Sequence, residues 1–220
     1  MKKIGLTLGK YAPLHKGHQY VIETALKEVD ELFVIIYDTP LISVPLHVRA
    51  GWIKTLYPQV TVIEARNSPS ENMPLPAYEK AEEEFIKKLL NGQPITHFYC
   101  SEYYGEHVSR ALGAQDRRVD EKRSTVPVSA TKIRQNTFEN RRFLSPVVYK
   151  DLIQKIVFMG APSTGKTTLA QALAKDLNTV WMPEYGREYW AEHQINRRIG
   201  LKGFITIAKT HIAREDMLLQ

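Results

Sequence analysis

The sequence has 220 residues, enough for about one and a half average domains, and its 43% hydrophobic and 25% charged residues are typical of a folded globular protein. A formal net charge of +6 favours anionic partners, and because the lysines and arginines form no clustered tract, we expect nucleotide substrates and no nucleic-acid or membrane partner. The single cysteine, Cys100, excludes an intramolecular disulfide and a cysteine zinc cluster. No stretch is apolar for long enough to form a signal-peptide core or to cross a bilayer, so we expect a cytoplasmic protein.

Apolar runs and helical patterns alternate through the first part of the chain. The runs expected to form strands are residues 4–8, 32–37, 60–63 and 97–101, and the helical patterns are residues 17–29, 48–57 and 77–90. This alternation predicts βαβ units and a parallel sheet covered on both faces. Residues 67–76 contain three prolines and are expected to form a surface loop, with an active-site lid as the alternative.

A second domain is expected to begin near residues 146–153. The pattern weakens after Phe138, and a fresh strand is expected at residues 155–159, directly before a glycine-rich turn. A helix at residues 168–177 and an apolar run at residues 180–182, expected as a second strand, come next. Two further helical patterns follow, the last of them from about Leu201 to the end. We therefore divide the chain into domains 1–150 and 151–220, the second of them partial because little chain remains for a complete sheet.

Two histidines flank a glycine shortly after the first expected strand, which ends at Gly9 and Lys10. His15, Gly17 and His18 would open the first helix, at the edge of the sheet where α/β proteins bind ligands. Free N–H groups at a helix start favour a phosphate, and imidazoles can donate to phosphate oxygens or, when protonated, offset transition-state charge. The alternative is two surface histidines in a loop.

A second anion-binding pattern lies at residues 128–134. Ser129 and Thr131 stand at alternate positions there, and Arg134 follows one helical turn after Thr131. Ser129 alone would be explained as a helix N-cap. Two such helix starts in one domain are hard to obtain by chance, so we expect them to serve one phosphate site.

Residues 160–167 fit the P-loop pattern G-x-x-x-x-G-K-[ST] and lie between an expected strand and an expected helix. The glycines would free backbone N–H groups to surround phosphates, Lys166 would reach the β- and γ-phosphates, and Thr167 would ligate Mg²⁺ carried by the nucleotide. Chance matches rarely have both the strand and the helix in place. The candidate nucleotide-binding residues are Gly160, Ser163, Thr164, Gly165, Lys166, Thr167 and Thr168.

The order of these motifs resembles a known family. An H-x-G-H segment after the first strand, paired with S-x-T-x-x-R, looks like the nucleotidyltransferase superfamily. With residues 101–105, residues 112–114 and the appended P-loop, essentially the whole chain resembles the bifunctional nicotinamide-mononucleotide adenylyltransferase/ribosylnicotinamide kinase family. The resemblance implies an α/β fold: a Rossmann-like nucleotidyltransferase domain with a parallel sheet, followed by a partial P-loop kinase domain.

By that resemblance, the first domain transfers AMP from ATP to nicotinamide mononucleotide, giving NAD and pyrophosphate, with Mg²⁺ bound to the ATP. His15 and His18 would contact the ATP phosphates as catalytic residues. Gly9, Lys10 and Gly17 would lie beside them in the binding site.

The resemblance also implies that Ser129, Thr131 and Arg134 bind the β- and γ-phosphates, which leave as pyrophosphate, and Arg134 is counted as catalytic. Trp52 is a further candidate, because its ring could stack on the nicotinamide. A place in the core is the alternative for Trp52, and it is the one we favour.

In the second domain, the resemblance implies that Glu184 and Arg187 line a nicotinamide riboside pocket. Glu184 would orient or deprotonate the acceptor hydroxyl, and Arg187 would bind phosphate. A solvated helix N-terminus is the alternative explanation for Glu184. We find no Walker B strand and no arginine-bearing lid before Gln220, so we expect this chain to lack kinase activity.

Other functions remain compatible with the sequence. A transferase for a different phosphorylated acceptor would keep both first-site motifs but would not explain the P-loop. An NAD-responsive sensor with a degenerate kinase domain would explain both, whereas a DNA-binding repressor is not expected because the first strand begins at Ile4. A homo-oligomer and either the nicotinamide or the nicotinate substrate are compatible with these motifs.

Overall fold

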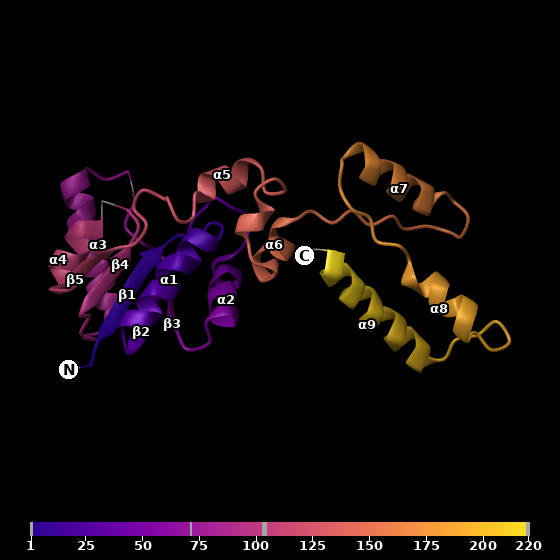
Figure 1. Ribbon diagram of the computed structural model, residues 1–220, viewed down its shortest axis with the longest axis horizontal. Coiled ribbons are helices and arrows are strands. Elements are labelled where there is room, and N and C mark those ends of the chain that lie inside the picture. The colour runs from indigo at the N-terminus through magenta and orange to yellow at the C-terminus, as the bar shows by residue number, and fades with distance from the viewer. Residues whose placement is uncertain (1, 71, 103–104, 219–220) are drawn as a thin grey trace. The chain divides into compact units, whose positions relative to one another are not determined.

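A computed structural model describes residues 2–70, 72–102 and 105–218 of the chain (Figure 1). The chain divides into two compact units, Met1–Leu152 and Ile153–Gln220. Three sequence expectations extend beyond the described residues, namely the loop at residue 71, the family motif at residues 103 and 104, and the C-terminal helix at residues 219 and 220. No helix in the described part of the chain is both long and apolar enough to cross a bilayer.

The first unit is built on a sheet of five parallel strands in the order β3-β2-β1-β4-β5. Four strands confirm the expectation from the apolar runs. The sequence does not predict the fifth, QDRR, because it is polar throughout; it forms by backbone pairing with β4 at the sheet edge, where its side chains stay partly exposed. The strands are β1 Ile4–Gly9, β2 Glu31–Tyr37, β3 Thr61–Ala65, β4 His97–Cys100 and β5 Gln115–Arg118.

Three long helices of the first unit confirm the expected helical patterns to within two residues at each end. α4 and α6 are not predicted, because seven residues carry too little periodicity, and α6 occupies the region expected to be a polar connector. The helices are α1 Lys16–Glu28, α2 Leu46–Leu56, α3 Leu75–Leu90, α4 Glu106–Leu112, α5 Ala130–Gln135 and α6 Pro146–Leu152, with a 3₁₀ turn at Arg141–Phe143.

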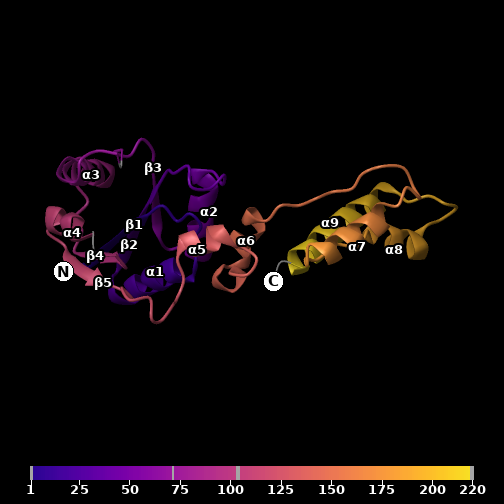
Figure 2. The same ribbon diagram turned by 90° about the horizontal axis from the view of Figure 1, so that it is seen from above.

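The order of the strands reverses at the centre of the sheet. The connections through α1 and α2 build outward from β1 to β2 and β3, and α3 then leads back to β4 on the other side of β1. Figure 2 shows α1 and α3 on opposite sides of the strands. In open α/β sheets, ligands bind beyond the carboxyl ends of the strands at such a reversal, here between β1 and β4.

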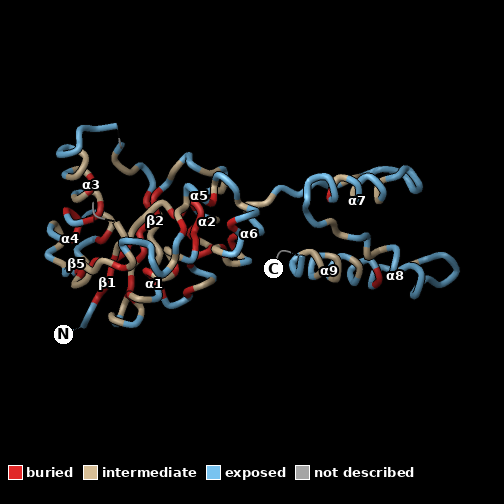
Figure 3. The backbone as a smooth tube through the Cα atoms, turned by 45° about the horizontal axis from the view of Figure 1, so that its top comes forward, coloured by how far each residue is buried: buried red, intermediate tan, exposed pale blue. Residues whose placement is uncertain are grey.

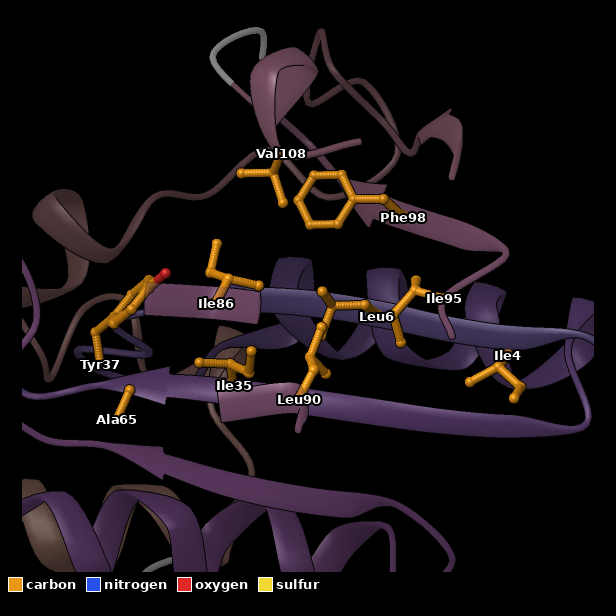
Figure 4. Close-up of a cluster of buried hydrophobic side chains, with 10 residues drawn as sticks. All are labelled: Ile4, Leu6, Ile35, Tyr37, Ala65, Ile86, Leu90, Ile95, Phe98 and Val108. Atoms are coloured by element: carbon orange, nitrogen blue, oxygen red, sulfur yellow. The ribbon is translucent and has the colours of Figure 1, made fainter. Parts of the chain in front are cut away.

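One face of the sheet is closed by α3 and α4 through a continuous apolar cluster (Figure 4). Leu6, Ile35 and Phe98 from three strands pack with Ile86 of α3 and Val108 of α4. Burying a side chain of this size stabilises the fold by roughly 1.5–3 kcal/mol, so this cluster fixes the strands whose ends carry the site. Its members are Ile4, Leu6, Ile35, Tyr37, Ala65, Ile86, Leu90, Ile95, Phe98 and Val108.

The second unit consists of helices in the part that the structure describes. They are α7 Lys166–Asp176, α8 Tyr185–His193 and α9 Leu201–Leu218. α8 packs against α9, and an ion pair of 2.7 Å joins Glu188 to Arg214. Ala174 and Gly203 are the only buried residues among those described here, so most of the unit is coloured as exposed in Figure 3.

The strands expected at residues 155–159 and 180–182 are wrong: both segments run without regular structure. Ile156, Val157 and Met159 are 62%, 76% and 88% exposed. An apolar run becomes a strand only when a neighbouring strand takes up its backbone hydrogen bonds, and none of the described residues of this unit provides one.

A buried arginine holds the loop that follows β1. Arg49 on α2 is 0% exposed, and its guanidinium donates to the backbone carbonyl of Lys10 directly after β1. It also donates to the carbonyls of Tyr37 at 3.0 Å and Val44 at 3.2 Å. A carboxylate oxygen of Asp38 lies 3.2 Å away and balances the charge. The ends of β1 and β2 are therefore tied to one side chain.

We predict that Arg49→Met lowers the free energy of unfolding by roughly 2–4 kcal/mol, because several buried carbonyls lose their donor. Urea denaturation of the full chain measures this change. Arg66→Met is the matched control, since the Arg66 side chain is 68% exposed and forms a surface ion pair with Glu64 at 3.5 Å. That control is expected to change stability by less than about 1 kcal/mol. Equal effects of the two substitutions would contradict the role given to Arg49.

Candidate functional site

A cavity of about 140 Å³ opens beyond the carboxyl ends of β1, β4 and β5. The start of α1 forms one wall, the segments after β4 and β5 form another, and the start of α5 completes it. Both phosphate-binding patterns of the sequence therefore contribute to one cavity. Its lining residues are His15, Gly17, His18, Ser101, Glu102, Val119, Asp120, Arg123, Val126, Val128, Ser129, Ala130 and Thr131.

His15 is the N-cap of α1 and folds back over the first turn of the helix. Its Nδ1 accepts hydrogen bonds from the backbone N–H groups of Gly17 and His18, at 3.1 and 3.4 Å. Nδ1 of His18 in turn accepts from the backbone N–H of His15 at 3.4 Å, and the two rings stack with centroids 3.7 Å apart. Glycine is needed beneath this cap, because a Cβ at Gly17 would lie 2.9 Å from Cε1 of His15.

This hydrogen bonding determines what the two imidazoles can do. Because each Nδ1 accepts a backbone N–H, each neutral ring carries its proton on Nε2. Burial, aided by the charge of Arg123, lowers the pKa of His15 to about 4. Burial, His15 and Arg123 together lower the pKa of His18 well below its ordinary value. Both rings are therefore neutral at pH 7 and offer Nε2–H donors.

The structure corrects one part of the sequence interpretation. The N–H groups of Gly17 and His18 were expected to be free for a phosphate, but they are already bonded to the His15 ring. The helix start thus holds the ring of His15, and the N–H groups of Gly17 and His18 are not free for a ligand.

Arg134 joins the loop between β1 and α1 to the first turn of α5. Its Nη1 donates to the carbonyl of Ala12 at 2.6 Å, and its Nη2 donates to the hydroxyl of Thr131 at 3.0 Å. Ser129 is the N-cap of α5, as its alternative explanation held, and accepts from the N–H of Lys132 at 3.2 Å. The hydroxyls of Ser129 and Thr131 keep their own protons for donation to a ligand oxygen.

Four candidates of the first domain lie outside the lining of this cavity, namely Arg134, Gly9, Lys10 and Trp52. Gly9 ends β1, and Lys10 follows it, with its carbonyl held by Arg49. Trp52 is only 1% exposed, and its Nε1 donates to the carboxylate of Asp151 at 2.7 Å. This corrects its inclusion among the binding residues: an enclosed indole has no open face on which a nicotinamide could stack, and Trp52 belongs to the core.

The cavity also contains three charged residues that the sequence does not single out, Glu102, Asp120 and Arg123. Glu102 follows β4, where a functional residue could have been sought. Asp120 and Arg123 follow β5, and since the polar sequence of β5 gives no strand signal, their place at the edge of the sheet could not be seen.

The P-loop residues form a turn before α7. Gly160 and Gly165 have φ angles of +150° and +81°, which favour glycine, and Ser163 also has a positive φ of +62°. Nζ of Lys166 donates to the carbonyl of Ala161 at 2.6 Å, so the ammonium group lies across the loop. The Thr164 hydroxyl donates to the same carbonyl at 2.9 Å.

Thr167 and Thr168 lie in the first turn of α7, and the half-buried Thr167 offers a hydroxyl oxygen beside Lys166. Oxygen is the ligand that Mg²⁺ prefers, so Thr167 fits an ion that arrives with a nucleotide. No cluster of three His, Cys, Asp or Glu side chains that could hold a metal occurs among the described residues. Glu184, the N-cap of α8, lies 3.8 Å from Arg187, and both are largely exposed.

Two family models match the chain. A cytidylyltransferase-like model covers residues 6–136, and an AAA domain model covers residues 155–219, which include the P-loop. The trifunctional NAD biosynthesis/regulator protein NadR of Escherichia coli is 30% identical over 221 residues, covering 91% of this chain and 53% of that protein. The chain spans about half the length of the curated relatives it matches.

Two solved structures of NadR protein are also similar to this chain. NadR protein in complex with NR matches with a TM-score of 0.64 at 25% identity, over 98% of this chain and 64% of that chain. NadR protein in complex with NAD and AMP-PNP matches with a TM-score of 0.65 at 23% identity, over 100% of this chain and 66% of that chain. These likenesses confirm the fold class and the family resemblance that the sequence motifs indicate.

We predict that the first unit loses stability as the pH falls from 6.5 to about 4. His15 has an ordinary pKa of 6.5 when unfolded and about 4 when folded, so the unfolded chain binds more protons within this window. The stabilisation is full above pH 6.5 and is lost as the pH approaches 4. Urea denaturation at several pH values measures this slope.

His15→Asn, which keeps a good N-cap, is expected to flatten that slope. His47→Asn, at an exposed position on α2, is the matched control and is expected to leave the slope unchanged. A slope that is as steep in His15→Asn as in the unaltered chain would rule out this account of the buried ring.

Proposed function

The chain belongs to the cytidylyltransferase-like family, and on that premise we propose that its first unit transfers AMP from ATP to nicotinamide mononucleotide, giving NAD and pyrophosphate. The observation that carries the proposal is the pair of Nε2–H donors, from His15 and His18, in one cavity with the hydroxyls at the start of α5. The choice of acceptor is supported by the similarity to NadR, which is named for NAD biosynthesis.

In this reaction, a phosphate oxygen of nicotinamide mononucleotide attacks the α-phosphorus of ATP. The bond from that phosphorus to the oxygen bridging the β-phosphorus breaks, and pyrophosphate leaves with both electrons of the bond. No covalent enzyme intermediate is needed, so the protein contributes position and charge stabilisation. Neutral Nε2–H groups of His15 and His18 suit this task, because they can donate to the reacting phosphate without accepting a proton.

The remaining candidates take supporting roles. Ser129 and Thr131 would donate their hydroxyl protons to the β- and γ-phosphates, and Arg134 would add positive charge while keeping Thr131 in place. Gly17 permits the close approach of the His15 ring. Gly9 ends β1 and Lys10 follows it, and together they lead into this loop.

We further propose that the second unit binds the phosphates of ATP. Backbone N–H groups of residues 160–165, other than Pro162, would surround them, and Lys166 would leave the Ala161 carbonyl for a phosphate oxygen. Mg²⁺, held by Thr167 and the nucleotide, would neutralise phosphate charge when it is bound, and Thr168 would complete the first turn of α7. Glu184 and Arg187 would face an acceptor such as nicotinamide riboside.

We predict that His18→Ala lowers the rate of adenylyl transfer by about 10²–10³, the usual effect of losing one preorganised donor to a transition-state phosphate. Pyrophosphate release from ATP and nicotinamide mononucleotide measures the rate. Nicotinate mononucleotide and phosphopantetheine, supplied as alternative acceptors, test the specificity. His47→Ala is the control, since His47 is exposed on α2. Near-normal turnover by folded His18→Ala would refute the assignment.

We predict that the 220-residue chain forms no nicotinamide mononucleotide from nicotinamide riboside and ATP. Phosphoryl transfer requires a well-positioned metal and acceptor as well as a P-loop, and the unpaired run at residues 155–159 gives the loop no sheet to hold it. Chromatographic detection of the mononucleotide tests this. Turnover that disappears in Lys166→Ala would show that the second unit is a working kinase.

A further inference from the structure

Arg123 and Glu102 form an ion pair at the cavity that also contains His15 and His18. A guanidinium nitrogen of Arg123 lies 3.2 Å from a carboxylate oxygen of Glu102. Their side chains are 44% and 41% exposed, so both can be reached by a ligand entering from solvent. Exposed pairs of this kind stabilise a fold little, which makes their exchange for another partner easy.

The backbone on both sides of this pair is held by other groups. The carboxylate of Asp120 accepts from the N–H groups of Thr125 at 3.0 Å and Val126 at 2.8 Å, and from the hydroxyl of Ser124 at 3.2 Å. Arg118 donates to the backbone carbonyl of Glu102. The contact between the Arg123 and Glu102 side chains is therefore not needed to keep the loop after β5 or the turn after β4 in place.

The charge of Arg123 acts within the cavity. Arg123 and both rings line the same cavity, and its positive charge contributes to lowering the pKa of His15 and the pKa of His18. The rings are neutral, and Arg123 is the one arginine or lysine among the residues that line the cavity, so it supplies the positive charge of that lining. A phosphate bonded to the two Nε2–H groups would be drawn toward this charge.

We propose that Arg123 binds a substrate phosphate and that Glu102 holds the guanidinium in position until the phosphate replaces it. A carboxylate and a phosphate present the same pair of acceptor oxygens to a guanidinium, so one can substitute for the other. This inference rests on the proposed adenylyl transfer. It adds Arg123 as a residue that binds phosphate and Glu102 as the partner that the phosphate displaces.

Removing either charge of the pair would affect phosphate binding differently from what a purely structural ion pair would give. Removing the Arg123 charge weakens phosphate binding, whereas removing the Glu102 charge frees Arg123 and strengthens it. If the pair served only to hold two segments together, both substitutions would break the same contact and would shift binding in the same direction.

The test compares Arg123→Gln and Glu102→Gln in 220-residue chains that also carry Lys166→Ala, so that the P-loop does not contribute. Calorimetric titration gives the affinity for ATP, and pyrophosphate release gives separate KM values for ATP and nicotinamide mononucleotide. Arg123→Gln is expected to weaken one substrate by about 10- to 100-fold, as for a lost charge-assisted hydrogen bond, and Glu102→Gln to tighten the same substrate several-fold. The substrate affected identifies whose phosphate is bound.

Arg110→Gln and Glu106→Gln are the matched controls, since that exposed pair has the same 3.2 Å separation but lies outside the cavity lining. They are expected to leave every affinity unchanged. Shifts in the same direction for Arg123→Gln and Glu102→Gln, or no shift in either, would overturn the proposal. A third outcome is that the two substitutions shift the ATP affinity in opposite directions but the chain shows no turnover with nicotinamide mononucleotide. That result would support Arg123 as a phosphate-binding residue and would reject the proposed acceptor.

Discussion

The hydrogen bonds from the first turn of α1 to the ring of His15 are the interaction on which the candidate site depends. They occupy Nδ1, which leaves Nε2–H as the donor, and they bring the ring over Gly17, where no side chain would fit. They also place His15 against His18, and burial, aided by the charge of Arg123, lowers the pKa of both rings so that they stay uncharged. The geometry, the tautomer and the protonation state of the site thus share one local cause.

This loop is in turn held by residues that are distant in the sequence. Arg49 lies 39 positions from Lys10 and bonds its carbonyl, and Arg134 lies 122 positions from Ala12 and bonds that carbonyl. Backbone carbonyls cannot move away from such donors without leaving buried polar groups unpaired. The segment between β1 and α1 is therefore held by one arginine of α2 and one of α5, which is the kind of support that a positioned phosphate site requires.

The sequence predicts the features of the fold that follow from local pattern. The apolar runs of β1 to β4 and the long helices are found where expected, and both phosphate patterns contribute to one cavity. Pattern alone misses β5, whose QDRR sequence is a strand only because β4 lies beside it. Pattern alone also predicts a strand at residues 155–159. These residues have the composition of a strand but no neighbouring strand to pair with among the described residues. Arg123 was missed for the same reason as β5: its position depends on a pairing that no local signal reveals.

The way Asp120 secures its loop bears on how this protein could change over generations. Its carboxylate bonds mainly to backbone N–H groups, at Thr125 and Val126, and these are present whatever side chains the loop carries. The side chains of residues 121–123 take no part in these bonds, and the backbone limits exchange mainly at Arg123, whose φ is +50°. In a loop built in this way, the group that holds the backbone differs from the side chain that lines the cavity. Selection could therefore alter the charge at the cavity, one residue at a time, while the path of the loop stays the same.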